Sequence, residues 1–182
     1  GLDGAKRYIE RVYRLITEKE FSKKFVTEND GKLDYIYNFT VKKVTHDFEN
    51  LQFNTGISQL MILTNEFYKA EKIYLPYLEG FLKMFNCVCP HVGEELWQIL
   101  GHDDVIVYEP WPTYDESKTI DDKIELPVQV NGKLKTTVMI SLDEDESSIK
   151  AKVHSALEGK LDGKSIVKEI YVKNKIYNVV VK

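Results

Sequence analysis

The sequence predicts an α+β protein, in which an N-terminal antiparallel helical bundle is followed by a small ββαββ domain. Up to Gly101, apolar residues recur at spacings of three and four, which is the pattern of helices with one buried face. Two later segments instead alternate apolar and polar residues around short turns, and a helical segment separates them. The acid-rich stretch 113–123 has neither period. We therefore place the domain boundary there, with a bundle over residues 1–118 and the small domain over residues 119–182.

Five helices are expected in the bundle, and each follows from its apolar spacing. Pro76 and Pro90 suit first helical turns, where the missing N–H is not needed, and Gly101 suits a helix end. Residues 21–33 break the period and are expected to form a connecting loop. The predicted helices cover residues 1–19, 34–50, 53–68, 76–85 and 90–100.

Residues 105–112 are expected to be extended, because Pro110 and Pro112 cannot lie inside a helix. Trp111 lies between these prolines, and Trp97 lies on the preceding predicted helix. We expect these two indole rings to hold the connecting segment against the bundle.

The small domain is predicted as strand, turn, strand over residues 124–142, a helix over 144–158, and strand, turn, strand over 165–181. Asn131 and Gly132 suit a two-residue hairpin turn, because both accept a positive φ at little cost. The second hairpin places Asn174 between two lysines. One apolar face of the helix is expected to cover a four-stranded sheet.

Four lysines lie close to the predicted turn tips, where side chains reach solvent, and they suggest a surface for phosphates: Lys133, Lys135, Lys173 and Lys175. Alternatively, such lysines keep sheet edges soluble and prevent strand addition. Because the side chains are lysines, phosphate recognition would use point charges and would be salt-sensitive. Tyr171 flanks the second turn and either stacks on an exposed base or packs within the sheet.

Charge is distributed unevenly along a chain whose formal net charge is −4. Residues 1–118 contain 14 basic and 19 acidic side chains, whereas residues 119–182 contain 11 and 10. Residues 164–182 contain five lysines and the single acid Glu169, while Asp143 to Glu146 is an unbroken acidic run. The small domain is therefore the part that suits an anionic partner.

Neither a catalytic site nor a metal site is predicted. The nucleotide-binding, hydrolase and metalloprotease motifs with known spacing do not occur. Cys87, Cys89 and His91 supply three potential zinc ligands, but a closed site needs four and His102 lies beyond a whole helix. Buried free cysteines at a helix junction are the favoured interpretation.

The chain is expected to act in the cytoplasm and not in a membrane. Its apolar stretches are too short to cross a bilayer, and its N-terminus lacks a signal-peptide pattern. Cys87 and Cys89 are too close in sequence to favour a mutual disulfide, which suits a reducing compartment.

Several motifs occur together and in a fixed order. They are Phe53-Asn54-Thr55-Gly56-Ile57, Pro90-His91-Val92-Gly93-Glu94-Glu95-Leu96-Trp97, Trp111-Pro112, Val128-Gln129-Val130-Asn131-Gly132-Lys133, and the closing segments 167–172 and 178–181. In this order they resemble the C-terminal end of bacterial leucyl-tRNA synthetases, over essentially the whole chain. The helical motifs are shared with valine and isoleucine enzymes, whereas the Asn131 hairpin and the small terminal domain resemble leucine enzymes.

The resemblance implies a portion of a synthetase that lies after the catalytic domain. The HIGH and KMSKS signatures of the family have no counterpart here, so ATP and Mg²⁺ would serve the full-length enzyme, and this portion would be non-catalytic and without a cofactor. The implied partners are tRNA(Leu) and the catalytic domain of the same polypeptide, without DNA, in a monomer. The implied tRNA-contacting residues are Asn131, Lys133, Lys135, Tyr171, Lys173 and Lys175. The family commonly has an arginine shortly after Asn-Gly-Lys, and here Lys135 retains only the charge.

Two alternatives remain open from the sequence. The acidic bundle could dock another protein, with the small domain as a scaffold, or the chain could be the equivalent portion of a valyl- or isoleucyl-type synthetase. The retained partner, an RNA or a protein, would discriminate between the first alternative and the main hypothesis.

Overall fold

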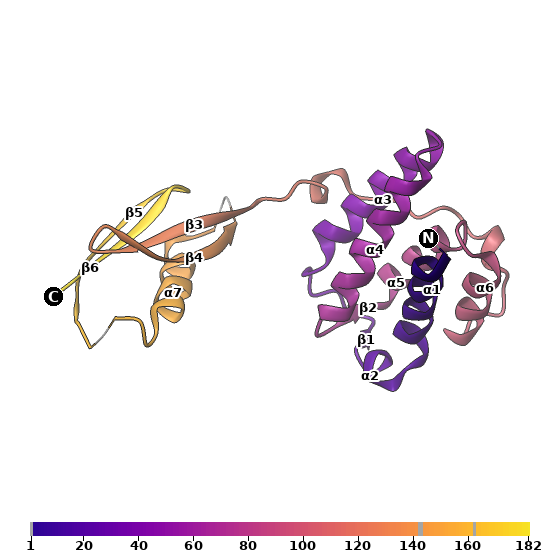
Figure 1. Cartoon of the computed structure of the whole chain (residues 1–182), viewed down its shortest axis with the longest axis horizontal. Coiled ribbons are helices and arrows are strands. Elements are labelled where there is room, and N and C mark those ends of the chain that lie inside the picture. Colours follow the sequence, from indigo (N-terminus) through magenta and orange to yellow (C-terminus); the bar gives the residue numbers. More distant parts are fainter. Residues whose placement is uncertain (1, 142–143, 162) are drawn as a thin grey trace. The chain divides into compact units, whose positions relative to one another are not determined.

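The computed structural model describes residues 2–141, 144–161 and 163–182. The chain divides into two compact units, Gly1–Ile120 and Asp121–Lys182, and each has its own hydrophobic core. Helices build the first unit, and a four-stranded sheet with one helix builds the second (Figure 1). The predicted α+β class is confirmed.

Within the described residues the first unit has six α-helices, and five of them match the predicted ones to within two residues. Pro76 lies in the first turn of the fifth helix and Pro90 opens the sixth, where a missing N–H leaves no helical bond unmade. The predicted first residue, Gly1, lies outside the described residues. The helices are α1 (Leu2–Thr17), α2 (Lys19–Ser22), α3 (Asp34–Glu49), α4 (Phe53–Lys69), α5 (Leu75–Phe85) and α6 (Pro90–Ile99).

The core of the first unit consists mainly of the predicted apolar stripes. Phe67 of α4 meets Phe81 of α5 edge to face, with ring centroids 5.7 Å apart, and both side chains are fully buried. Some apolar residues of the predicted helices are instead exposed, among them Leu2, Ala5, Tyr13, Phe53 and Ile99. Leu2 and Phe53 are the first residues of their helices, so no preceding helical turn covers them.

Helices α3 and α5 pack tightly against each other at Gly80. The Tyr37 ring of α3 stacks on the Tyr77 ring of α5, with centroids 3.9 Å apart and an interplanar angle of 15°. A Cβ atom at Gly80 would lie 1.9 Å from the Tyr37 hydroxyl oxygen, so this position has no room for a side chain. Burial of the Tyr37 hydroxyl raises its pKa above the ordinary value.

The prediction of a plain loop over residues 21–33 is wrong. The short helix α2 leads into β1 (Phe25–Val26), which pairs in parallel with β2 (Ile73–Tyr74). Ile73 N–H also donates to the Lys24 carbonyl at 2.8 Å. Strands of two residues are too short to show an alternating pattern, and their partners are far apart in sequence.

The prediction that residues 105–112 are extended is wrong in part. The segment after α6 is tied to the helices. It contains two 3₁₀ helices, η1 (Ile106–Tyr108) and η2 (Glu116–Lys118). Trp111 Nε1 donates to Thr45 Oγ1 at 2.8 Å, as expected for a ring that fixes this segment, and Asp115 N–H donates to Asn38 Oδ1 at 2.8 Å. The Trp97 ring of α6 stacks on the His102 ring, which lies at the start of this segment, with ring centroids 3.7 Å apart.

The second unit has the predicted ββαββ order. The sheet order is β4-β3-β6-β5, in which both hairpins are antiparallel and the central pair β3–β6 is parallel. Leu142 and Asp143, which the predictions included, lie outside the described residues. The elements are β3 (Lys123–Val130), β4 (Lys133–Ser141), α7 (Glu146–Leu157), β5 (Ile166–Val172) and β6 (Ile176–Val181).

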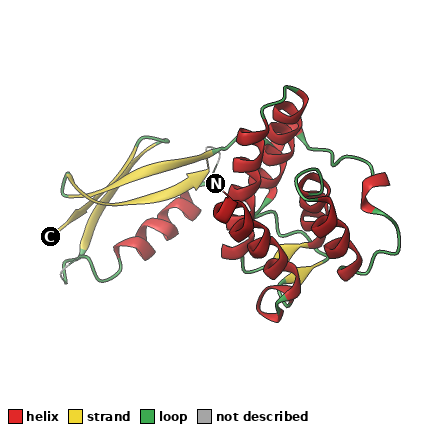
Figure 2. Cartoon of the chain, turned by 45° about the vertical axis from the view of Figure 1, so that its right-hand side comes forward, coloured by secondary structure: helices red, strands yellow, loops and turns green. Residues whose placement is uncertain are grey.

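Helix α7 covers one face of this sheet (Figure 2). Three apolar residues on successive turns of α7 are buried against alternate residues of the central strands, such as Val128 and Val179. They are Ile149, Val153 and Leu157. The Asp145 carboxylate accepts from Ser148 N–H at 2.9 Å and caps the helix start. The helix therefore begins two residues after the predicted position 144.

Glu169 of β5 joins the sheet to α7. Its carboxylate accepts from Lys150 Nζ at 2.6 Å, from His154 Nε2, and from the buried Tyr177 hydroxyl at 3.1 Å. Burial alone would raise the pKa of Glu169, but these three donors outweigh it and hold the pKa below the ordinary value. The carboxylate is therefore neutralised inside the unit.

Glu144 plays a similar part at the other end of α7. It accepts from Ser141 N–H at 2.9 Å and from Ser148 Oγ at 2.6 Å, and it pairs with Lys152 at 2.6 Å. The Lys152 ammonium, followed by the Ser148 hydroxyl, lowers the pKa of Glu144 to about 2. These contacts join the end of β4 to the first turns of α7.

The second unit is expected to lose stability in acid through Glu144. The folded-state pKa of Glu144 lies below the unfolded value of about 4.3. Its contribution to the free energy of unfolding is therefore complete above pH ~4.3 and is lost as pH falls toward 2. In Glu144→Gln, the unit should be less stable than the parent at pH 6, and the difference should shrink at pH 3. Urea midpoints from resolved amide NMR peaks of β3 to β6 measure this. Glu125→Gln, at an exposed strand position, is the charge-matched control, and an equal pH dependence in both variants would contradict the assignment.

Candidate nucleic-acid interface

The first predicted turn forms as expected, but the Asn131 side chain is used within the sheet. Asn131 and Gly132 both have positive φ, at 50° and 79°. Asn131 Nδ2 donates to the Val181 carbonyl at 3.1 Å, and Asn131 Oδ1 accepts from Val181 N–H at 2.9 Å. Gly132 N–H donates to Asn178 Oδ1 at 3.1 Å. The turn is thereby fixed to the end of β6, and contact of Asn131 with RNA stays a prediction.

Lys133 and Lys135 follow this turn and are exposed. Lys133 lies opposite Val130 in the ladder. The register then shifts, because Gln129 pairs with Leu134 and Val128 pairs with Thr136, so Lys135 is the extra residue of a β-bulge. Bulges redirect side chains and are common near functional sites.

The second predicted turn also forms, around Asn174 with a φ of 57°. Asn174 N–H donates to the Tyr171 hydroxyl at 3.1 Å, and the Tyr171 ring lies 5.8 Å from the buried Tyr177 ring. Tyr171 packs against the core of the unit, which favours the sheet-packing interpretation. Lys173 and Lys175 flank the turn and are exposed.

Strand register places the two turns at opposite ends of the sheet (Figure 1). Strand β3 runs into the Asn131 turn, whereas its parallel neighbour β6 runs out of the Asn174 turn. Val130 pairs with Val179, so Asn131 is level with position 180, six residues along β6 from Asn174. At about 3.3 Å per residue the turns are about 20 Å apart. The four predicted lysines therefore form two pairs and not one cluster.

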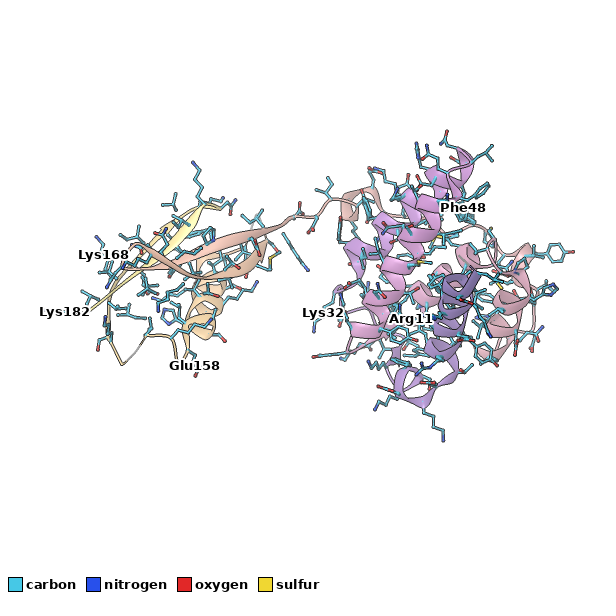
Figure 3. All side chains as sticks on the ribbon, viewed as in Figure 1. Arg11, Lys32, Phe48, Glu158, Lys168 and Lys182 are labelled. Carbon is cyan, nitrogen blue, oxygen red and sulfur yellow. The ribbon has the colours of Figure 1, made fainter. Side chains whose placement is uncertain are left out.

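Three further lysines join the Asn131 turn, and the predicted site residues did not include them. Lys182 and Ser165 exchange two backbone hydrogen bonds, at 3.0 and 3.1 Å, which places Lys164 and Lys182 at the same end of the sheet. Lys168 pairs with Val180, two residues before Lys182, and Figure 3 shows both lysines toward this end of the sheet. The excess of lysine over residues 164–182 was the available sequence signal. The sequence did not show that these lysines lie beside the Asn131 turn, because that placement depends on the pairing of β3 with β6.

The cysteine and histidine side chains do not converge on a metal position in the part of the chain that the structure describes. No group of three or more His, Cys, Asp or Glu residues there could hold an ion. Cys87 is exposed and Cys89 half-buried, so the expectation that both are buried is wrong. His102 is engaged elsewhere, since its Nε2 lies 2.7 Å from a Glu79 carboxylate oxygen. Among the described helices, none has the length and apolar character needed to span a membrane.

Comparison with known proteins yields a family and a similar structure. The family described as the anticodon-binding domain of tRNA ligase matches residues 30–153. The chain is also similar to a protein in the crystal structure of the ternary complex of Agrobacterium radiobacter LeuRS, tRNA and LeuAMS, with 30% identity and a TM-score of 0.59. That match covers 98% of this chain but only 25% of the solved one.

Proposed function

Because this chain belongs to the anticodon-binding domain family of tRNA ligases, we propose that it is the tRNA-holding C-terminal portion of a leucyl-tRNA synthetase. The observation that carries the proposal is the similarity over nearly the whole chain to a LeuRS that was solved with tRNA. Leucylation, which uses ATP and Mg²⁺, would then belong to the catalytic part of the same class I polypeptide. The setting would be the bacterial cytoplasm, with a monomeric enzyme and tRNA(Leu) as its RNA partner.

The physical basis of the proposed grip is phosphate neutralisation. Within the second unit, Lys150 and Lys152 form ion pairs with described carboxylates. The lysines at the two turns form none with the residues that the structure describes, so their charges are available to an external anion. Neutralised phosphates release counterions, which favours binding and makes it sensitive to salt. Such contacts position an RNA without reading its bases.

The proposal predicts that the 182-residue chain binds a leucine tRNA transcript in a salt-dependent manner. The logarithm of the association constant should fall with the logarithm of salt concentration with a slope of about −2 or steeper, as expected for three or more neutralised phosphates. Fluorescence anisotropy at five salt concentrations measures this slope. Valine and isoleucine tRNA transcripts are the matched competitors. The proposal expects a preference for the leucine transcript, which must come from tRNA shape because phosphate contacts do not read bases.

Two results would contradict this proposal in different ways. Tighter binding of the valine or isoleucine transcript would assign the chain to one of those enzymes. Absence of salt-dependent binding to any of the three transcripts, together with stoichiometric capture of a protein, would favour the interaction-module alternative.

A further inference from the structure

The two ends of the sheet in the second unit differ in their acidic side chains. Glu144 accepts from Ser141 N–H at the end of β4, and Ser141 pairs with Lys123 at the start of β3. The acids of the α7 start and of the β3 start therefore share one end, which we call the linker end. Its described acids are Asp121, Asp122, Glu125, Glu144, Asp145 and Glu146.

The Asn174 turn lies toward this acidic end. Position 174 is level with about position 125 of β3, by extension of the pairing between Val128 and Tyr177. Lys173 and Lys175 are therefore close to the level of Glu125. Carboxylates at the same end of the sheet oppose the attraction that these two ammonium groups exert on a phosphate, and this effect declines over a Debye length of about 8 Å at physiological salt.

The opposite end, which we call the Asn131 end, gathers lysines from three strands or their flanks. Lys133 and Lys135 come from β4, Lys164 and Lys168 from the start of β5, and Lys182 follows β6. Four strands spaced by about 4.8 Å span about 14 Å, so the backbone positions of these five lysines lie at or near one narrow end of the sheet. All five side chains are exposed.

Described carboxylates do little to neutralise the Asn131 end. Glu169 is the acid of β5 there, but Lys150, His154 and Tyr177 already occupy its oxygens. Glu158 lies beyond the end of α7 and is separated from Lys168 and Lys182 in Figure 3. The Asn131 end therefore carries an excess of positive charge, and the linker end carries an excess of negative charge.

We propose that the phosphate backbone of RNA binds the Asn131 end through Lys133, Lys135, Lys164, Lys168 and Lys182, and that the Asn174 turn lies outside this site. The inference rests on the proposed function and specifies the RNA-binding surface within it. The Asn131 amide bonds with both backbone polar groups of Val181 and so joins the end of β6 to the turn that carries Lys133.

Two triple variants of the full chain test the inference. Lys133→Gln, Lys135→Gln and Lys168→Gln remove three charges from the Asn131 end, while Lys123→Gln, Lys173→Gln and Lys175→Gln remove three from the linker end. Both sets change the net charge equally and use exposed strand or turn positions. With a leucine tRNA transcript, the first set should make the salt slope shallower by about 2 to 3, at roughly 0.7–0.9 per lost contact. The second set should leave the slope within error of the parent.

Each other outcome has a distinct meaning. A slope that changes equally in both sets, or more in the linker-end set, overturns the inference while RNA binding by the chain stands. A parent chain without salt-dependent binding overturns the proposed function and this inference with it. If the Asn131-end set aggregates but keeps the parental slope, the lysines protect the sheet edges, and the inference is wrong. Amide NMR spectra of both variants verify that the second unit is folded.

Discussion

Replacing Gly80 by alanine is expected to destabilise the helical unit by about 3 kcal/mol, the upper part of the range for overpacked cores. The added Cβ would lie 1.9 Å from the Tyr37 hydroxyl oxygen and 2.9 Å from its Cζ. Tyr37 cannot move aside easily, because its ring is buried and stacked on Tyr77 at 3.9 Å. Either the ring leaves the core or helices α3 and α5 separate.

Tryptophan fluorescence in urea measures this effect directly, because both tryptophans of the chain, Trp97 and Trp111, lie in the helical unit. Gly4→Ala is the matched control, since a Cβ there meets nothing within 4 Å and the helix propensity improves. Adding Tyr37→Phe to Gly80→Ala should recover part of the loss, because the closest contact is removed. A Gly80→Ala midpoint equal to that of the control would contradict the assigned clash.

Replacing Glu169 by alanine is expected to destabilise the second unit by about 3 kcal/mol. The substitution leaves the buried Tyr177 hydroxyl without its acceptor, which costs about 1–3 kcal/mol. It also removes the partner of the exposed Lys150 and His154 side chains, which adds about 0.2–1 kcal/mol for each. Glu169→Gln should be intermediate, because an amide oxygen can still accept from Tyr177. A unit of this size has little stability to spare.

Urea unfolding followed by the amide NMR peaks of the sheet measures the loss. Glu125→Ala is the control, because Glu125 is exposed on β3 and such substitutions stay within about 0.5 kcal/mol. The tryptophan-reported midpoint of the helical unit should not move in either variant. Equal losses in Glu169→Ala and Glu125→Ala would show that the cluster around Glu169 contributes little.

Local patterns were sufficient to predict most of the fold. Each long helix has an apolar stripe with a period near 3.6, and prolines or glycines mark the ends of several. Asn131, Gly132 and Asn174 have the positive φ that their turns required. The strands β1 and β2 were not predicted, because two residues are too few to show an alternating pattern and the two strands are far apart in the sequence.

The candidate site was only partly predictable, because its geometry depends on contacts between distant residues. The parallel pairing of β3 and β6 separates the two lysine-bearing turns, and neither hairpin sequence indicates that pairing. The Asn131 amide bonds with Val181, 50 residues away, so its engagement could not be read from the turn motif alone. Lys182 reaches the site through the same long-range pairing.

The central place of β6 has a consequence for synthesis on the ribosome. The contacts of the helical unit lie within the first 120 residues, so that unit can fold while the rest of the chain is still being made. The sheet, by contrast, lacks the strand between β3 and β5 until β6 emerges. At 5–20 residues per second, residues 142–182, which follow the hairpin of β3 and β4, take about 2–8 s to synthesise. During that time the nascent hairpin of β3 and β4 has an unpaired inner edge, which only β6 closes.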